Sequence, residues 1–445
     1  MLQFATIPMP APEGRSGIKD EGGSGAHLPN VLIVIPYHRI YPPFNGGTQR
    51  SFNILHQLTR HFDVTALVFQ DPATLTAAFG EYPSLKRARF VHAMPEELWP
   101  LSWLPARIRV ALQYRWYQRS FAGPADSDFL LYYPVLRRIL RAAQFDFIIV
   151  ENMASLNMVR AVRRLNPRAR IVFNAHNVDT RLALAAVEKG DVSLASCHRI
   201  RSIESSLHLR VHGVMACSAP DLDALQRMNG HRLRGAVVPN GVVLANQLYD
   251  GGVRDENCMN MIFCGSLDYG PNRDGLAWFY SHVWPLLQKE LPEATLTVVG
   301  SGKADAALER LRRDPAVRWG GYVPDVRPHY NAAAVAIVPL LSGSGTRLKI
   351  LEAMGLGVPV VTTVVGAEGI TGEADRHLSI ADTAGEFAAA VVALLRRKSL
   401  RLEIQKNART LVAEHYDWNV VGDGLKRWLE GMLEKQTHPL PLLNV

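Results

Sequence analysis

The apolar residues of this chain follow two patterns that alternate along most of its length. Short apolar runs, typical of buried strands, are separated by stretches with an apolar residue every three or four positions, typical of helices. The runs lie at residues 31–35, 64–69, 145–150, 170–173, 213–217, 261–264, 294–299, 335–339 and 358–362. Strands that alternate with helices in this way are joined by helical crossovers and form parallel sheets. The pattern therefore predicts an α/β protein.

The alternating pattern occurs twice, which predicts two domains. A strand, a glycine turn and a helix open the first unit at residues 31–60, and the same order recurs from residue 261. Between the two units, Pro-Asn-Gly at residues 239–241 is a turn signal. We expect Rossmann-like domains at residues 29–239 and 240–415, and a chain of 445 residues has room for two cores of that size.

Residues 1–28 follow neither pattern. They are rich in glycine, proline, alanine and serine, without the basic start and apolar core of a signal peptide, so we expect a disordered leader. No run of about 18 apolar residues occurs anywhere in the chain, and no transmembrane helix is expected. The four cysteines lack metal-like spacing and are typical of reduced thiols in a cytoplasmic protein.

The alternation is interrupted near residues 98–142, where we expect a helical insertion. Tryptophan, tyrosine and arginine are interleaved there on helical periods. Three interpretations stay open: a packed insertion with a solvated basic face, a wall of an acceptor site, and a basic amphipathic surface that lies on a membrane. The formal net charge of +8 suits an anionic ligand or surface, but no nucleic-acid recognition motif accompanies the arginines.

The strongest candidate site lies in residues 337–369, IVPLLSGSGTRLKILEAMGLGVPVVTTVVGAEG. This segment predicts a strand, a glycine–serine loop at residues 342–345, a helix and a second strand. Backbone N–H groups at the start of such a helix suit a phosphate, and Arg347 and Lys349 add mobile positive charge. Glu352 shares a helix face with Lys349 and can accept hydrogen bonds from sugar hydroxyls. The same residues would also serve as a simple helix cap with an exposed ion pair.

Three polar residues follow buried strands in the N-terminal unit. Glu151 ends the run at residues 145–150, and His176 and Asn177 come shortly after the run at 170–173. The carboxyl ends of parallel strands line the crevice of an open α/β sheet. We therefore expect these three side chains at one edge, on the acceptor side of a site. A cap on the following helix is an equal alternative for His176.

The string GSGTRLKILEAMGLGVPVVTTVVGAEGI resembles the donor segment of the GT4-type retaining glycosyltransferases, in particular sugar transferases of bacterial polysaccharide loci with a GTRLKxLEAM motif. The resemblance covers residues 30–420 and is strongest at 261–370. In this family two acidic residues, eight positions apart, flank the loop and helix. Glu352 matches the second acid, which binds the nucleotide ribose. Ser344 stands in place of the first, so the contact of that acid with the donor sugar is in question.

The resemblance also assigns roles in the N-terminal unit. Gly46 and Gly47 match a glycine pair in the loop after the first strand, where it approaches the donor phosphates and the acceptor. His176 matches a histidine that faces the transferred sugar.

In the C-terminal unit, Gly265 and Ser266 belong to the string GSLDYGPN, where the broader family has cations that bind the donor diphosphate. We infer that Arg347 and Lys349 take over that charge neutralisation. The expected catalytic residues are His176, Arg347 and Lys349. The expected donor-binding residues are Gly46, Gly47, Gly265, Ser266, Gly300, Ser344, Gly345, Thr346, Arg347, Lys349 and Glu352.

The resemblance implies the GT-B fold, in which two Rossmann-like domains face each other across a cleft and a C-terminal helix, here within residues 416–445, crosses back to the first domain. It implies transfer of a sugar from a UDP- or GDP-linked donor to a glycan, lipid-linked or other hydroxyl acceptor, with retention, in cell-surface polysaccharide or glycolipid assembly. We expect no metal or other cofactor, because the positive side chains can replace a divalent ion. The expected location is the cytoplasm, with peripheral inner-membrane contact through residues 98–141 as one option and no nucleic-acid partner.

Three other functions stay open. A protein that binds a nucleotide-sugar without turning it over is indicated by Ser344. A dehydrogenase with two Rossmann-like halves lacks its GxGxxG fingerprint here. An epimerase of the same fold would act on the donor itself, without an acceptor.

Overall fold

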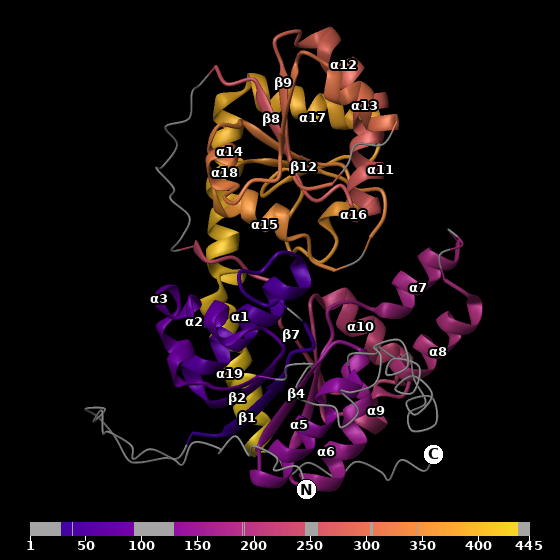
Figure 1. Ribbon diagram of the computed structural model, residues 1–445. Helices are drawn as coiled ribbons and strands as arrows, with labels where there is room; N and C mark the ends of the chain where they lie inside the picture. Colours follow the sequence, from indigo (N-terminus) through magenta and orange to yellow (C-terminus); the bar gives the residue numbers. More distant parts are fainter. Residues whose placement is uncertain are drawn as a thin grey trace, which may run out of the picture.

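The computed structural model describes residues 28–434, except for residues 38, 93–128, 189, 191, 245–256, 303–305 and 344. Nearly all of the predicted leader and most of the predicted insertion at 98–142 therefore lie outside the described residues. The described chain forms two lobes stacked one above the other (Figure 1). No helix in the described ranges is long and apolar enough to cross a membrane.

The N-terminal lobe contains a seven-stranded parallel sheet in the order β3-β2-β1-β4-β5-β6-β7. Its strands are β1 (Asn30–Val34), β2 (Asp63–Val68), β3 (Arg89–His92), β4 (Phe147–Glu151), β5 (Arg170–Asn174), β6 (Gly213–Ala216) and β7 (Gly235–Val237). Its helices are α1 (Gly46–His61), α2 (Pro72–Thr76), α3 (Ala78–Glu81), α5 (Phe129–Ala142), α6 (Val159–Leu165), α7 (Asp179–Glu188), α8 (Leu194–Glu204), α9 (Leu207–Arg210) and α10 (Ala219–Met228). The strand order reverses between β1 and β4, which opens a crevice at their carboxyl ends.

The C-terminal lobe repeats this plan with a six-stranded parallel sheet in the order β10-β9-β8-β11-β12-β13. Its strands are β8 (Asn260–Cys264), β9 (Thr295–Val299), β10 (Val317–Gly321), β11 (Val335–Val338), β12 (Val360–Thr362) and β13 (Ser379–Ile380). Its helices are α11 (Gly270–Trp278), α12 (Trp284–Glu290), α13 (Ala306–Arg313), α14 (Arg327–Asn331), α15 (Leu348–Gly355), α16 (Val364–Ala367), α17 (Ala384–Arg396) and α18 (Lys398–His415).

Helices cover both faces of each sheet, which explains why the strands read as unbroken apolar runs. In β1, Val31 and Ile33 pack toward α1, while Leu32 and Val34 pack toward α5 and α6 on the opposite face. All four side chains are fully buried. Burial of an aliphatic side chain stabilises the fold by roughly 1.5–3 kcal/mol, so each strand is anchored from both sides.

The last helix, α19 (Trp418–Glu434), leaves the C-terminal lobe and packs on α1 of the N-terminal lobe (Figure 1). Leu425 and Leu429 of α19 are buried in the core around α1. The chain thus passes between the lobes twice, and the two passages are bonded together: Val242 N–H donates to Tyr416 O at 2.8 Å and Trp418 N–H donates to Val242 O at 3.1 Å. Two parallel sheets flanked by helices confirm the expected fold class.

Candidate functional site

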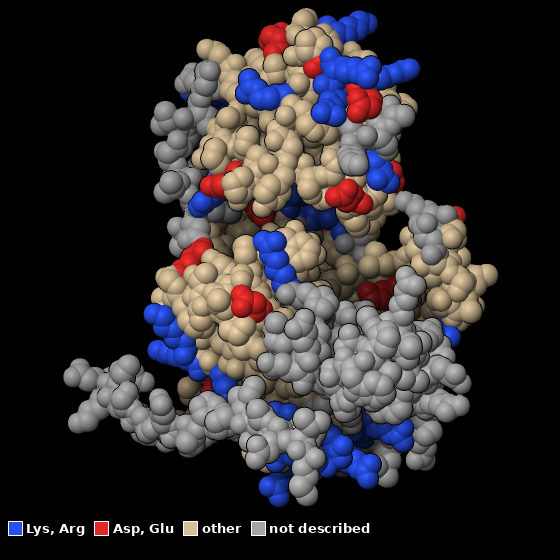
Figure 2. All heavy atoms as spheres, in the orientation of Figure 1, with Lys and Arg blue, Asp and Glu red and all other residues tan. Residues whose placement is uncertain are grey.

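A groove separates the two lobes, and basic and acidic side chains are visible within it (Figure 2). The start of α1 lies opposite α15, since a Cβ on Gly46 would be 3.6 Å from Leu348 Cδ1. Thr346 Oγ1 donates a hydrogen bond across the groove to Cys217 O at 3.1 Å. A Cβ on Gly345 would be 2.9 Å from Asn177 Oδ1. The structure therefore brings the glycine loop before α15 against the loops of the N-terminal lobe.

Arg347 differs from the expectation of a mobile cation. It occupies the cap position before α15, and the helix begins at Leu348. Only 8% of Arg347 is exposed, and its guanidinium donates to Gly345 O at 2.6 Å and to Val365 O at 3.4 Å. Burial lowers the pKa of Arg347. The reason for the difference is that buried carbonyl groups need a donor, so Arg347 joins Gly345 of the loop to Val365 of α16. Ser344 of the same loop lies outside the described residues.

Lys349 is directed at the carboxyl ends of β8 and β9. Its Nζ donates to Asn272 Oδ1 at 2.6 Å and lies 5.0 Å from the centre of the Phe263 ring. A Cβ on Gly265 would be only 2.5 Å from Lys349 Nζ, so a side chain at residue 265 would displace the ammonium group. Burial lowers the pKa of Lys349 to about 8. The lysine is thus a confined cation at the strand ends.

Gly265, Ser266 and Gly300, three of the expected donor-binding residues, follow the carboxyl ends of β8 and β9. Asn272 Nδ2 donates to Ser266 O at 2.8 Å, and its oxygen accepts from Lys349. A Cβ on Gly300 would overlap Gly265 O, which shows how closely β8 and β9 approach here. The two strand ends and α15 therefore form one cluster.

Glu352 lies one helical turn after Leu348 and is partly exposed. Burial raises the pKa of Glu352, and the neighbouring Lys349 charge opposes that rise. Within the described ranges its carboxylate accepts no hydrogen bond and forms no ion pair. The alternative of an exposed Lys349–Glu352 ion pair is therefore not realised, and both groups are available to a ligand.

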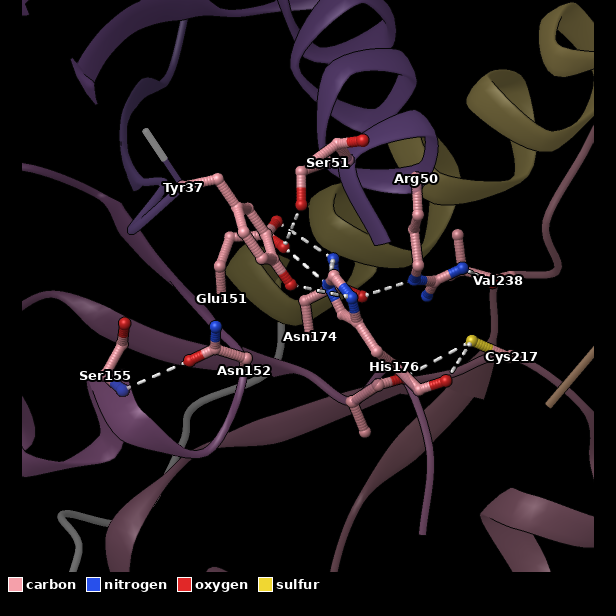
Figure 3. Close-up of polar contacts among 12 residues, drawn as sticks. Tyr37, Arg50, Ser51, Glu151, Asn152, Ser155, Asn174, His176, Cys217 and Val238 are labelled. Atoms are coloured by element: carbon pink, nitrogen blue, oxygen red, sulfur yellow. Dashed lines mark hydrogen bonds and ion pairs between the residues drawn. The ribbon is translucent and has the colours of Figure 1, made fainter. Parts of the chain in front are cut away.

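In the N-terminal lobe, Glu151 and His176 form a close pair (Figure 3). Glu151 Oε2 is 2.7 Å from His176 Nε2 and accepts from Ser51 Oγ at 2.8 Å. Glu151 is 0% exposed. Burial alone would raise the pKa of Glu151, but hydrogen bonds from His176, Asn174 and Ser51 and the His176 charge bring it below its usual value. We expected Glu151 on the acceptor side. The structure buries its carboxylate at the end of β4, where it contacts His176, Asn174 and Ser51.

His176 does not cap the helix that follows it, α7. The first N–H groups of α7 donate instead to Glu204, from Asp179 at 2.7 Å and from Thr180 at 2.9 Å. His176 Nδ1 lies 3.3 Å from the Tyr37 hydroxyl, and a Cβ on Gly47 would be 3.5 Å from the same nitrogen. His176 thus lies beside the start of α1, where the two lobes meet.

Sequence reasoning missed the polar residues behind His176. Arg50 is 1% exposed and donates from Nε to Asn174 Oδ1 at 2.9 Å. Its Nη1 donates to Val238 O at 2.6 Å and to Asn240 Oδ1 at 3.1 Å, in the passage between the lobes. One signal was available: an arginine next to a serine on the apolar face of a predicted helix needs buried partners.

The arrangement offers a cation and backbone donors in one lobe, and a held imidazole in the other. The described residues contain no group of three His, Cys, Asp or Glu side chains placed to hold a metal ion. This chemistry suits an anionic ligand with hydroxyl groups.

Two family models match the chain. "Glycosyl transferase 4-like domain" matches residues 45–241 and "Glycosyl transferases group 1" matches residues 259–397, together about three quarters of the chain. A Klebsiella pneumoniae protein, described as an uncharacterized 44.6 kDa protein in the cps region, is 31% identical over 169 residues, which is 36% of this chain and 43% of that protein. An uncharacterized glycosyltransferase of Haemophilus influenzae is 30% identical over 83 residues, 18% of this chain and 23% of that protein. The chain thus spans less than half the length of these curated relatives.

Solved structures share the architecture over nearly the whole chain. Sucrose-phosphate synthase from Thermosynechococcus elongatus has a TM-score of 0.65 at 15% identity, over 91% of this chain and 99% of that one. Anabaena HepE, solved in complex with UDP-glucose, has a TM-score of 0.63 at 14% identity, over 91% and 100%. At these identities the likeness shows the fold alone. Taken with the two family models, it means that the chain belongs to the group 1 glycosyltransferases of the GT4 type, with the GT-B fold.

Proposed function

We propose that the protein transfers a sugar from a nucleotide-sugar, UDP- or GDP-linked, to a hydroxyl group of an acceptor. The observation that carries the proposal is the confined ammonium group of Lys349 beside Gly265 and Asn272, one helical turn from the open carboxylate of Glu352. A diphosphate and a ribose diol are the two halves of a nucleotide that would satisfy these groups. HepE, of the same fold, has been solved with UDP and with UDP-glucose.

The proposed chemistry is transfer with retention at the anomeric carbon, driven by electrostatic stabilisation of the leaving diphosphate. Lys349 and the backbone N–H groups of the loop before α15 would oppose the negative charge that grows on the leaving group. Arg347 would contribute indirectly, because it donates to Gly345 O in this loop and to Val365 O in α16. The two lobes would exclude water from the donor when they close. No metal ion is part of this proposal.

The acceptor class we propose is a glycan or lipid-linked glycan of the cell surface, in line with the Klebsiella relative from the cps region. Peripheral contact with the inner membrane is supported by the basic surface of α5 and α6. Neither helix contains an acidic residue, and five of their arginines are exposed: Arg137, Arg138, Arg141, Arg160 and Arg164. A shallow hollow on α5 is lined by three of these arginines.

A thermal-shift screen with UDP, GDP, CMP and NAD tests the donor site, since a ligand of the folded state raises the melting temperature by mass action. We expect one nucleoside diphosphate to raise the melting temperature and Glu352→Ala to abolish that rise. Glu293→Ala, an exposed change in the same lobe, is the control. A rise with NAD, or none with any nucleotide, would overturn the proposal.

Loss of turnover with retained donor binding is the second candidate, because Ser344 replaces an acid of the family motif. Acceptor screens with the identified nucleotide-sugar distinguish the two. If the protein binds the nucleotide-sugar but forms no product and leaves the nucleotide-sugar unchanged, the result would favour a protein that binds the donor without turnover. Isomerised sugar still attached to the nucleotide would favour an epimerase.

A further inference from the structure

Arg50 fixes which groups donate and which accept in the buried hydrogen-bond network beside His176 (Figure 3). A guanidinium group has only donors. Because Arg50 Nε donates to Asn174 Oδ1 at 2.9 Å, the amide oxygen of Asn174 must face Arg50. The amide nitrogen of Asn174 then faces Glu151 and donates to Oε1 at 2.9 Å. The orientation of this amide, normally ambiguous, is therefore determined by its neighbour.

Glu151 continues the same direction, because an ionised carboxylate only accepts. Oε1 accepts from Asn174, and Oε2 accepts from Ser51 Oγ and faces His176 Nε2 at 2.7 Å. The pKa of the buried carboxyl is below its usual value, so the group is ionised near neutral pH. The nitrogen that faces it must carry a proton. In a neutral imidazole the other nitrogen, Nδ1, then has the free lone pair.

Nδ1 lies beside Tyr37 and the start of α1. It is 3.3 Å from the hydroxyl of Tyr37, and a Cβ on Gly47 would be 3.5 Å away. Gly46, the first residue of α1, lies against Leu348 of α15 in the other lobe. Nδ1 is thus directed toward the place where the two lobes meet, and Tyr37 is its hydrogen-bond partner in the structure.

We infer that Glu151 is a positioning residue that keeps the proton of His176 on Nε2, so that Nδ1 is presented at the groove as a hydrogen-bond acceptor for a hydroxyl group. Arg50, acting through Asn174, sets the direction of the chain of hydrogen bonds. The inference deepens the proposed function and rests on it for the nature of the ligand: the hydroxyl belongs to a sugar, in competition with the Tyr37 hydroxyl. In its neutral form His176 then serves as an acceptor through Nδ1.

Glu151→Gln should reverse the donor–acceptor direction of the hydrogen bond to His176 without changing the shape of the side chain at residue 151. Asn174 Nδ2 still needs an acceptor, so the oxygen of the new amide faces Asn174 and its NH₂ group faces His176. Nε2 must then accept, the proton moves to Nδ1, and Nδ1 can no longer accept from a hydroxyl group. An amide in place of a carboxylate thus exchanges the roles of the two ring nitrogens.

The first test reads the tautomer of His176 directly, by ¹⁵N NMR of histidine-labelled protein. Of the 15 histidines in the chain, the His176 signals are identified as those lost in His176→Asn. We expect the proton on Nε2 in the wild-type protein and on Nδ1 in Glu151→Gln, with Glu293→Gln unchanged. A proton on Nδ1 in the wild-type protein, or the same tautomer in Glu151→Gln, would overturn the inference. This measurement needs no enzymatic activity.

The second test leaves Glu151, Ser51 and Asn174 unchanged and compares two replacements of His176. The amide of asparagine overlaps the position of Nδ1, and that of glutamine overlaps Nε2. We expect His176→Asn to retain at least tenfold more kcat/KM than His176→Gln, and both to bind UDP like the wild-type protein. The reverse order of activities would overturn the inference. If the wild-type protein transfers no sugar at all, the proposed function fails, and the tautomer measurement still decides the role of Glu151.

Discussion

Replacing Lys349 with methionine would keep an unbranched apolar side chain in the C-terminal lobe and remove its charge. Burial lowers the pKa of Lys349 from 10.5 to about 8. Each pKa unit corresponds to 1.36 kcal/mol, so confining this ammonium group costs the folded protein about 3 kcal/mol at neutral pH. The side chain is partly exposed, and its hydrogen bond to Asn272 would be lost, which offsets about 1 kcal/mol. We expect Lys349→Met to be more stable than the wild-type protein by roughly 1–2 kcal/mol at pH 7.

The sign of the pH dependence follows from the lowered pKa. Between about pH 8 and pH 10.5 the unfolded chain binds more protons at this lysine than the folded protein does. Wild-type stability from this group therefore rises with pH through that window. The advantage of Lys349→Met should shrink over the same range. Urea unfolding followed by tryptophan fluorescence at pH 7 and pH 9.5 measures both quantities, with the exposed Lys406→Met as the control.

The same change should weaken the binding of UDP. A hydrogen bond to a charged group contributes roughly 1.5–3 kcal/mol, so isothermal titration should show binding weaker by about ten- to a hundredfold. A variant that is more stable and binds less tightly is the signature of a functional group held at a cost to the fold. A less stable Lys349→Met, or one that binds UDP as tightly as the wild-type protein, would refute the reasoning.

Three further predictions concern burial and pH. Burial, with the nearby Glu204 charge, raises the pKa of Asp179 to about 7. Below pH 7 the folded protein then binds more protons than the unfolded chain, so its stability falls as the pH rises toward 7. Asp179→Asn should therefore raise the melting temperature at pH 8, and this gain should vanish toward pH 4. A Cβ on Gly275 would overlap a backbone carbonyl after β11. Gly275→Ala should therefore lower the free energy of unfolding by roughly 1–3 kcal/mol and weaken the binding of UDP. The control is Gly424→Ala, whose new Cβ meets open space and which should be neutral or slightly stabilised in urea unfolding. Leu429→Ala should cost roughly 2–5 kcal/mol in the same assay, and a loss under 1 kcal/mol would contradict the docking of α19 on α1.

The fold could be predicted from the sequence because its strands are buried on both faces. A strand covered by helices on each side has no polar positions, so residues 31–35 and 335–339 read as unbroken apolar runs. The return of α19 to the first lobe could not be found this way. Its apolar face is that of any amphipathic helix, and only the resemblance to GT-B proteins indicated which lobe it covers.

The candidate site could be predicted in part. A motif fixes positions along the chain, and the structure places Lys349 near Gly265 and the glycine loop near Asn177. It does not fix the direction of a long side chain. Arg347 and Lys349 lie two residues apart on a cap and a first helical turn, and the structure turns one inward to the loop and the other toward β8. Charge in a sequence therefore gave no means of separating the cation that holds the loop from the one directed at the strand ends.

The buried charged side chains of the two lobes differ in their partners, and this difference indicates where a ligand would stabilise the protein. In the N-terminal lobe, Arg50 and Glu151 are joined through Asn174, so each charged group has a fixed hydrogen-bond partner. In the C-terminal lobe, burial shifts the pKa values of Lys349 and Glu352 toward their neutral forms, and no ion pair joins them within the described chain. A diphosphate and a ribose would relieve both costs at once. The donor should therefore stabilise the C-terminal lobe far more than the N-terminal one, and the polar network around His176 should be preformed before any sugar arrives.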